Sequence, residues 1–131
     1  MEMGTLAGKI MDSIQHGYEV KYIPDALATL YRPSIQPFMK SWMEYDPQQE
    51  IKKLNIPVLL LQGNTDKQVT VKDAENLKKA NPKAKLVIVD QMNHVLKTAP
   101  EDMQENMATY NEPDLPLHPV FTVALINFIK Y

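Results

Sequence analysis

The chain has 131 residues, enough for one domain with a hydrophobic core. Hydrophobic residues make up 44% and charged residues 23%, and the formal net charge is -2 without a long run of one sign. This balance gives no electrostatic basis for binding nucleic acid or an anionic membrane surface. The absence of cysteine excludes disulfides and thiolate metal sites, and no apolar stretch reaches the ~20 residues of a membrane span.

The first part of the chain, up to about residue 54, carries helical patterns only. Apolar residues from Leu6 to Ile14 recur at helical spacing, and Gly17 marks the end of that helix. Prolines set the bounds of the later helices, because proline is favoured in a first turn and stops a preceding helix. The sequence predicts a second helix between Pro24 and Pro33, a third over about 35–44 and a fourth from Asp46-Pro47, the last burying Ile51 and Leu54.

From Ile56 onward the pattern changes to alternating strands and helices, so we predict an α/β fold. Apolar runs at 58–62 and 86–89 are typical of strands covered on both faces. Thr70-x-x-Asp73 resembles a capping box that opens a helix between them. Two such strands joined by a helix form a short parallel sheet with flanking helices. A last helix, 120–131, is apolar on nearly every side and is expected to be mostly buried.

Polar residues follow each predicted strand at its carboxyl end. Asp66 lies four residues past the first strand, and His94 lies five residues past the second. Adjacent parallel strands bring such positions together, and a carboxylate there can orient an imidazole as a general base. Gly63 can let the backbone turn sharply before Asp66. The sequence therefore makes Asp66 and His94 the candidate catalytic residues.

Other residues compete for these roles. Asp90 stands four residues before His94 and is the stronger rival acid, whereas Asp73 is better explained as a helix cap. His16 and His118 lie at helix ends or in loops, where we expect them to be solvated. No cluster of histidine and acidic residues has metal-ligand spacing, so no metal site and no cofactor are predicted.

The stretch from Tyr45 through Gly63-Asn64-Thr65-Asp66-Lys67-Gln68-Val69 to Met92-Asn93-His94 resembles the C-terminal half of an α/β-hydrolase. In that superfamily Gly-x-x-Asp after the penultimate strand supplies the triad acid, and a loop after the final strand supplies the histidine. The resemblance implies that Asp66 is the acid and His94 the base. It also implies two parts, a helical cap-like segment at 1–45 and the C-terminal part of the hydrolase core at 46–131.

The resemblance departs from the family pattern at the nucleophile, which the superfamily places upstream in Gly-x-Ser-x-Gly. Ser13, Ser34 and Ser41 have no flanking glycines and follow no apolar strand. We therefore expect a partial α/β-hydrolase fold, a fragment that supplies the acid and base of a triad and is inactive alone. The alternative is a natural binding or assembly module with a relic acid and histidine pair.

The parent reaction implied by the resemblance is hydrolysis of an ester, amide or related acyl bond in a small-molecule substrate. Haloalkane or epoxide chemistry also fits the superfamily, because the nucleophile is not part of this sequence. The first strand would present an open apolar edge without upstream neighbours, so self-association through that edge is expected.

Overall fold

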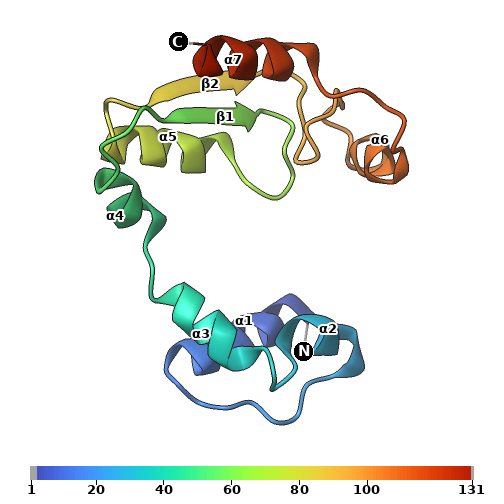
Figure 1. The fold of residues 1–131 in the computed structure, drawn as a ribbon. Coiled ribbons are helices and arrows are strands. Elements are labelled where there is room, and N and C mark those ends of the chain that lie inside the picture. Colours follow the sequence, from blue (N-terminus) through green and yellow to red (C-terminus); the bar gives the residue numbers. More distant parts are fainter. Residues whose placement is uncertain (1–2, 131) are drawn as a thin grey trace. The chain divides into compact units, whose positions relative to one another are not determined.

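The computed structural model describes residues 3–130 and divides the chain into two compact units, Met1–Asp46 and Pro47–Tyr131. The first unit contains helices alone among its described residues, and the second contains a two-stranded sheet with helices around it (Figure 1). Within residues 3–130, no helix has the length and apolar character needed to cross a membrane.

Three helices form the first unit, α1 (Met3–Gln15), α2 (Asp25–Tyr31) and α3 (Gln36–Met43). Its core consists of Ile10, Ile14, Leu27 and Tyr31. The predicted stop of α1 is confirmed, because Gly17 adopts a φ of +87°, a left-handed conformation that glycine accepts without strain. These helices agree with the predicted helical pattern of this part of the chain.

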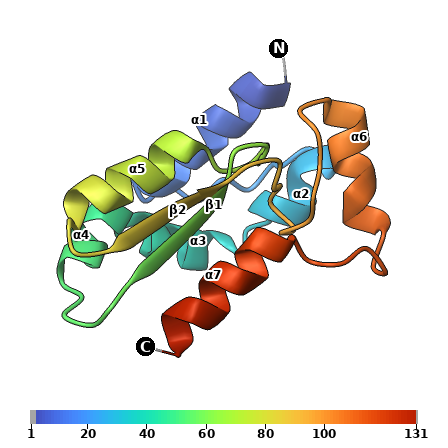
Figure 2. The same cartoon turned by 90° about the horizontal axis from the view of Figure 1, so that it is seen from above.

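The second unit is an α/β arrangement around one small sheet. Its elements are α4 (Pro47–Lys52), β1 (Leu59–Gly63), α5 (Val71–Ala80), β2 (Lys85–Val89), α6 (Met103–Ala108), the 3-10 helix η1 (Thr109–Asn111) and α7 (Pro119–Ile129). β1 and β2 are parallel, in a register from Leu59 opposite Lys85 to Gly63 opposite Val89. α5 covers one face of the sheet and α7 the other (Figures 1 and 2). This unit is a partial α/β-hydrolase fold, as predicted.

The connection between the two strands begins with the predicted capping box. The Thr70 side chain accepts the Asp73 N–H, and the Asp73 carboxylate accepts the Thr70 N–H at 2.9 Å. Both groups satisfy backbone or side-chain donors that the first turn of α5 would otherwise leave unpaired. This cap fixes where α5 starts, and α5 in turn sets the path of the chain from β1 to β2.

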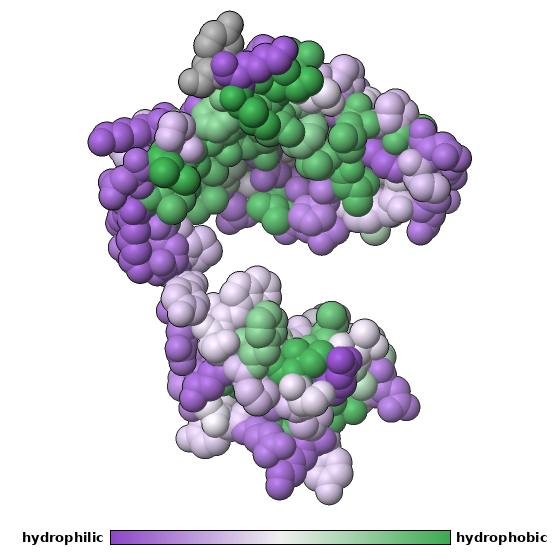
Figure 3. Space-filling model, in the orientation of Figure 1, coloured by the Kyte–Doolittle hydropathy of each residue, from purple (hydrophilic) through white to green (hydrophobic). Residues whose placement is uncertain are grey.

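Two burial predictions are wrong. Leu54 lies beyond the end of α4 and is exposed, while Ile51 is buried. α7 buries none of its side chains completely, and its exposed residues include Val120, Val123, Ile126 and Ile129. The reason is that α7 packs mainly against the two strands of a narrow sheet, which leaves much of its apolar side uncovered in the described chain. Figure 3 shows apolar side chains gathered at this helix.

Candidate active site

Asp66 lies in the loop between β1 and α5, and its side chain is only 7% exposed. Its Oδ1 accepts the backbone N–H groups of Gln68 at 2.8 Å and Val69 at 2.9 Å. Its Oδ2 accepts the Gln62 side-chain amide at 3.3 Å and faces His94 Nδ1 at 3.0 Å. The loop thus folds around the carboxylate and aims one oxygen at the imidazole.

The environment of Asp66 favours its charged form. Burial by itself raises the pKa of a carboxyl group, and this is the largest single influence on Asp66. Hydrogen bonds from the Val69 and Gln68 backbones, together with the hydrogen bond and charge of His94, outweigh burial and hold the pKa of Asp66 below its ordinary value. Asp66 is therefore an anion at neutral pH.

His94 lies in the loop after β2 and its side chain is 41% exposed. When Nδ1 carries the ring proton, it donates to the Asp66 carboxylate, and the lone pair on Nε2 is left available as a base. The Asp66 anion would then stabilise the imidazolium that forms when Nε2 takes a proton. The pair is thus arranged for general base catalysis directed from Nε2.

Close backbone packing brings the two loops together. A Cβ added to Gly63 would lie 1.8 Å from the Met92 carbonyl oxygen, so no other residue fits there without displacing the β2 loop. That carbonyl also accepts the Thr65 N–H at 3.3 Å. The chain turns at residues 64–65, directly before Asp66, and Gly63 ends β1 without a positive φ. Glycine is required here by the approach of the neighbouring loop.

The Asn64 side chain, in the loop after β1, forms two hydrogen bonds to the turn after β2. Asn64 Nδ2 donates to Asp90 Oδ1 at 2.7 Å, and Asn64 Oδ1 accepts the Gln91 N–H at 2.7 Å. Gln91 has a φ of 54°, a left-handed conformation that costs free energy for a residue with a Cβ. The Asn64 contacts thus hold a strained turn in the segment that leads to His94.

The rival site residues lie elsewhere. Asp90 is exposed and is held by Asn64, and within the described residues it has no ion pair with His94. Asp73 caps α5. His16 is exposed beside Asp12, whereas the expectation that His118 is solvated is wrong. The His118 Nδ1 accepts the Val120 N–H, so this side chain caps the start of α7. The His118 backbone N–H donates to the Leu96 carbonyl, and the residue is buried.

The three serines belong to the first unit, and each has a local partner. Ser13 donates to the Lys9 carbonyl, Ser41 donates to the Phe38 carbonyl, and Ser34 accepts from Arg32. Ser13 and Ser41 stand on helices, without a preceding strand or sharp turn. Thr65, which directly precedes Asp66 in the chain, is buried and donates to the Ala99 carbonyl. Ser13, Ser34 and Ser41 therefore stand in no strand-to-helix turn, and the Thr65 hydroxyl is already engaged with the Ala99 carbonyl.

The chain matches the model of a known protein family. The family described as TAP-like protein, of the α/β-hydrolases, matches residues 39–111. The chain belongs to the α/β-hydrolase superfamily. No curated protein gives a significant match.

The match to the α/β-hydrolase family covers both strand-end loops. It runs from α3 to η1 and therefore includes β1, α5, β2, Asp66 and His94. Membership indicates hydrolase-type function.

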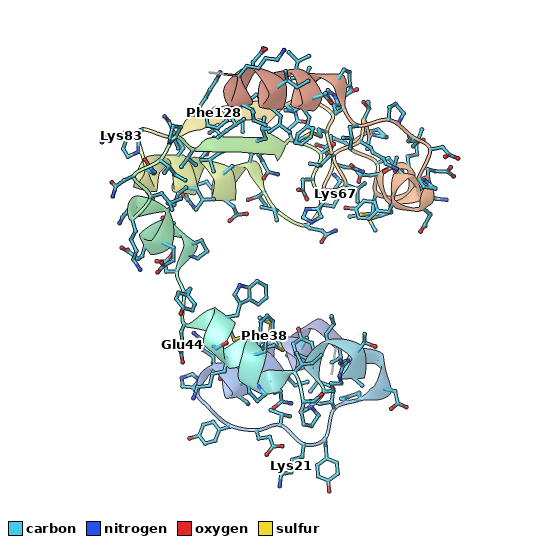
Figure 4. The ribbon with its side chains drawn as sticks, in the orientation of Figure 1. Lys21, Phe38, Glu44, Lys67, Lys83 and Phe128 are labelled. Carbon is cyan, nitrogen blue, oxygen red and sulfur yellow. The ribbon has the colours of Figure 1, made fainter. Side chains whose placement is uncertain are left out.

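Lys67, next to Asp66 in the chain, lies at the same end of the sheet, where its ammonium group pairs with Glu101 (Figure 4).

Several residues around the pair were not predicted. Gln62, Asn64, Asn93 and Asn106 form most of the side-chain hydrogen bonds around these loops. Gln62 carried a weak signal, because it is a polar residue at the end of an apolar strand. Asn106 carried none, since an asparagine in a short acidic helix gives no sign of its burial.

Proposed function

We propose that Asp66 and His94 are the acid and base of a nucleophile–histidine–acid triad in a hydrolase acting on ester, amide or related acyl bonds of a small molecule. One observation carries this proposal, namely the 3.0 Å contact between His94 Nδ1 and the buried Asp66 Oδ2 at the carboxyl ends of two adjacent parallel strands. Membership of the α/β-hydrolases supports it.

The chemistry follows from the position of Nε2. A hydroxyl nucleophile would give its proton to His94 Nε2 as its oxygen attacks the acyl carbon. The same proton then passes to the leaving alcohol or amine as the acyl–heteroatom bond breaks, giving an acyl-enzyme. Water then attacks the acyl carbon of the acyl-enzyme and loses a proton to Nε2. As the bond between the acyl carbon and the nucleophile's oxygen breaks, Nε2 returns that proton to the oxygen, which releases the acid and restores the hydroxyl. Asp66 keeps its charge throughout and stabilises the imidazolium.

We assign the nucleophile to a part of the polypeptide outside these 131 residues. The local partners of Ser13, Ser34 and Ser41 and the absence of a Gly-x-Ser-x-Gly turn support this assignment. Residues 46–131 would then be the C-terminal part of the hydrolase core, and residues 1–45 a helical cap-like segment between the nucleophile and that part.

A fluorophosphonate probe tests the proposal, because it labels only a serine activated by its base. The 131-residue chain is expected to remain unlabelled and to be inactive on p-nitrophenyl acetate. The protein encoded by the whole reading frame is expected to be labelled at an upstream serine, and His94→Ala is expected to abolish that labelling. Asp66→Asn is expected to weaken the labelling. Asp90→Asn is its matched control and should leave the labelling unchanged, because Asp90 is paired with Asn64 and not with His94.

Three results would count against the proposal. Stoichiometric labelling of a serine within the 131 residues would place the nucleophile inside the chain. Full labelling of the His94→Ala protein would remove the role of His94. A reading frame that encodes no strands and no Gly-x-Ser-x-Gly turn would instead favour a binding or assembly module with a relic pair.

The open edge of β1 supports a further part of the proposal, self-association of the isolated chain. Val58 O accepts the Lys85 N–H and the Asn64 N–H donates to Val89, so Leu59 and Leu61 point their backbone groups away from β2. No other strand of the described chain pairs with this edge. Such an edge pairs readily with another strand. Light scattering should therefore show dimers or larger species, and a monomer at high concentration would contradict this part.

A further inference from the structure

A fully buried asparagine in α6 connects the loops that carry Asp66 and His94. Asn106 is 0% exposed, and its Nδ2 donates to the Thr65 carbonyl at 2.9 Å and to the Pro100 carbonyl at 2.9 Å. Thr65 directly precedes Asp66 in the chain. The Asn106 amide thus connects the backbone next to Asp66 with the backbone at Pro100, which follows His94 in the chain.

The same asparagine reaches the other loop through a second buried asparagine. Asn93, 1% exposed, directly precedes His94. Its Nδ2 faces Asn106 Oδ1 at 3.4 Å and donates to Thr109 Oγ1 at 2.7 Å, while its Oδ1 accepts the Lys97 N–H at 3.1 Å. Thr109 in turn donates to the Asn106 carbonyl at 2.8 Å, which closes a small network at the end of α6.

We infer that Asn106 is a positioning residue that sets the distance between Asp66 and His94 by fixing the residues immediately before each of them. This inference rests on the proposed function, since it concerns the geometry of the same pair. Hydrogen bonds of the Asn106 side chain go to the residues that precede Asp66 and His94 in the chain, so Asn106 acts on the pair through Thr65 and Asn93. Hydrogen bonds of this kind, one residue removed from a histidine, fix the orientation of its ring. A buried network of this kind is rigid when all of its polar groups have hydrogen-bond partners.

The physical reason lies in the cost of leaving this network. Every described side-chain polar atom that is buried has a hydrogen-bond partner, so each loop can move only by unpairing a buried group. A shift of Thr65 or Asn93 would leave the Asn106 amide or the Thr65 carbonyl buried without a hydrogen-bond partner. The hydrogen bonds of α6 therefore favour one distance between Asp66 and His94.

The test measures the tautomer of His94 in the 131-residue chain, with no need for the nucleophile. Long-range proton–nitrogen NMR spectra at alkaline pH report the ratio of the Nδ1–H to the Nε2–H form, and His94→Gln identifies the signals. Because a hydrogen bond to a carboxylate favours Nδ1–H, the ratio is expected to fall about fivefold or more in Asn106→Ala.

Asn81→Ala is the matched control. Asn81 is also a buried asparagine of this unit, and its Nδ2 donates to the Ile51 carbonyl at 3.1 Å, away from the pair. It should lower stability in a similar way and leave the His94 ratio unchanged within about twofold. A fall in Asn106→Ala no greater than in Asn81→Ala would overturn the inference, because the effect would then be general loosening.

A milder variant decides the question if Asn106→Ala does not fold. Thr109→Val keeps the shape of the side chain and removes the acceptor of Asn93, so the ratio should fall by about twofold to threefold. No change in a folded Thr109→Val protein would overturn the inference. If the unmodified chain itself lacks the Nδ1–H form, the pair is not formed and the proposed function fails, which is a separate and distinguishable result.

Discussion

Gly63→Ala is predicted to separate the two loops that form the site. The added Cβ would lie 1.8 Å from the Met92 carbonyl oxygen and 2.5 Å from its carbon. Real Cβ contacts below 3.0 Å essentially do not occur, so the carbonyl must retreat by at least about 1.2 Å. The Thr65 N–H bond to that carbonyl, 3.3 Å long, would then be broken.

The magnitude follows from these two effects. Overpacking a buried position costs about 1–3 kcal/mol, and a lost backbone hydrogen bond costs about 1 kcal/mol, so we expect a loss of about 2–4 kcal/mol in the stability of the second unit. Met92 is 1% exposed and cannot move into solvent without further loss. His94 follows Met92 by two residues, so its 3.0 Å contact with Asp66 should open as well.

Urea unfolding followed by NMR signals of the second unit measures this loss, because Trp42, the only tryptophan, lies in the first unit and reports on that unit. Gly8→Ala is the matched control, since nothing lies within 4 Å of a Cβ at that position in α1. It should stabilise the first unit by about 0.5–1 kcal/mol. A Gly63→Ala protein that loses less than about 1 kcal/mol and keeps the His94 Nδ1–H form would refute the reasoning.

Three further predictions concern the cap, the carboxylate and the surface. Thr70→Ala removes one half of the capping box and should destabilise the second unit by about 1 kcal/mol in urea unfolding; an unchanged midpoint would show that the cap contributes nothing. The pKa of Asp66 is lower in the folded state than its ordinary value of 3.8, so its stabilising contribution is present above that value and is lost as pH falls through the lower folded value. Urea midpoints should therefore decline less steeply on acidification in Asp66→Asn than in the unmodified chain, and parallel declines would contradict this. Val123→Glu changes a side chain that is 58% exposed, so stability should change by less than about 0.5 kcal/mol while light scattering shows weaker association. Unchanged association would show that the exposed side of α7 takes no part in it.

The sequence by itself determined the order of elements in both units. Proline and glycine positions set the helix ends, as Gly17 shows for α1, and the apolar runs predicted β1 and β2 to within a residue at each end. These signals are local, because they depend on backbone conformations that one or a few residues permit. The capping box at Thr70 and Asp73 is of the same kind.

The parallel pairing of the strands followed from the same local signals, since a helix between two strands enforces it. That pairing already brought the positions of Asp66 and His94 to one end of the sheet. It did not decide between Asp66 and Asp90 as the partner of His94, because both stand close to a strand end. The structure gives the contact to Asp66, whose loop wraps its carboxylate, and turns Asp90 toward Asn64.

Burial was predicted poorly where it depends on which segments lie alongside. α7 reads as a buried helix from its composition, yet its outer side is exposed because two strands are too narrow to cover it. The sequence indicated a turn after Gly63, but it did not indicate that glycine is also needed there for the close approach of Met92. The buried contacts of Asn93 and Asn106 join positions 13 residues apart, and those of Asn106 and Thr65 join positions 41 residues apart. A local sequence pattern does not reveal such contacts, so only the tertiary structure decides which polar residues connect the loops that carry Asp66 and His94.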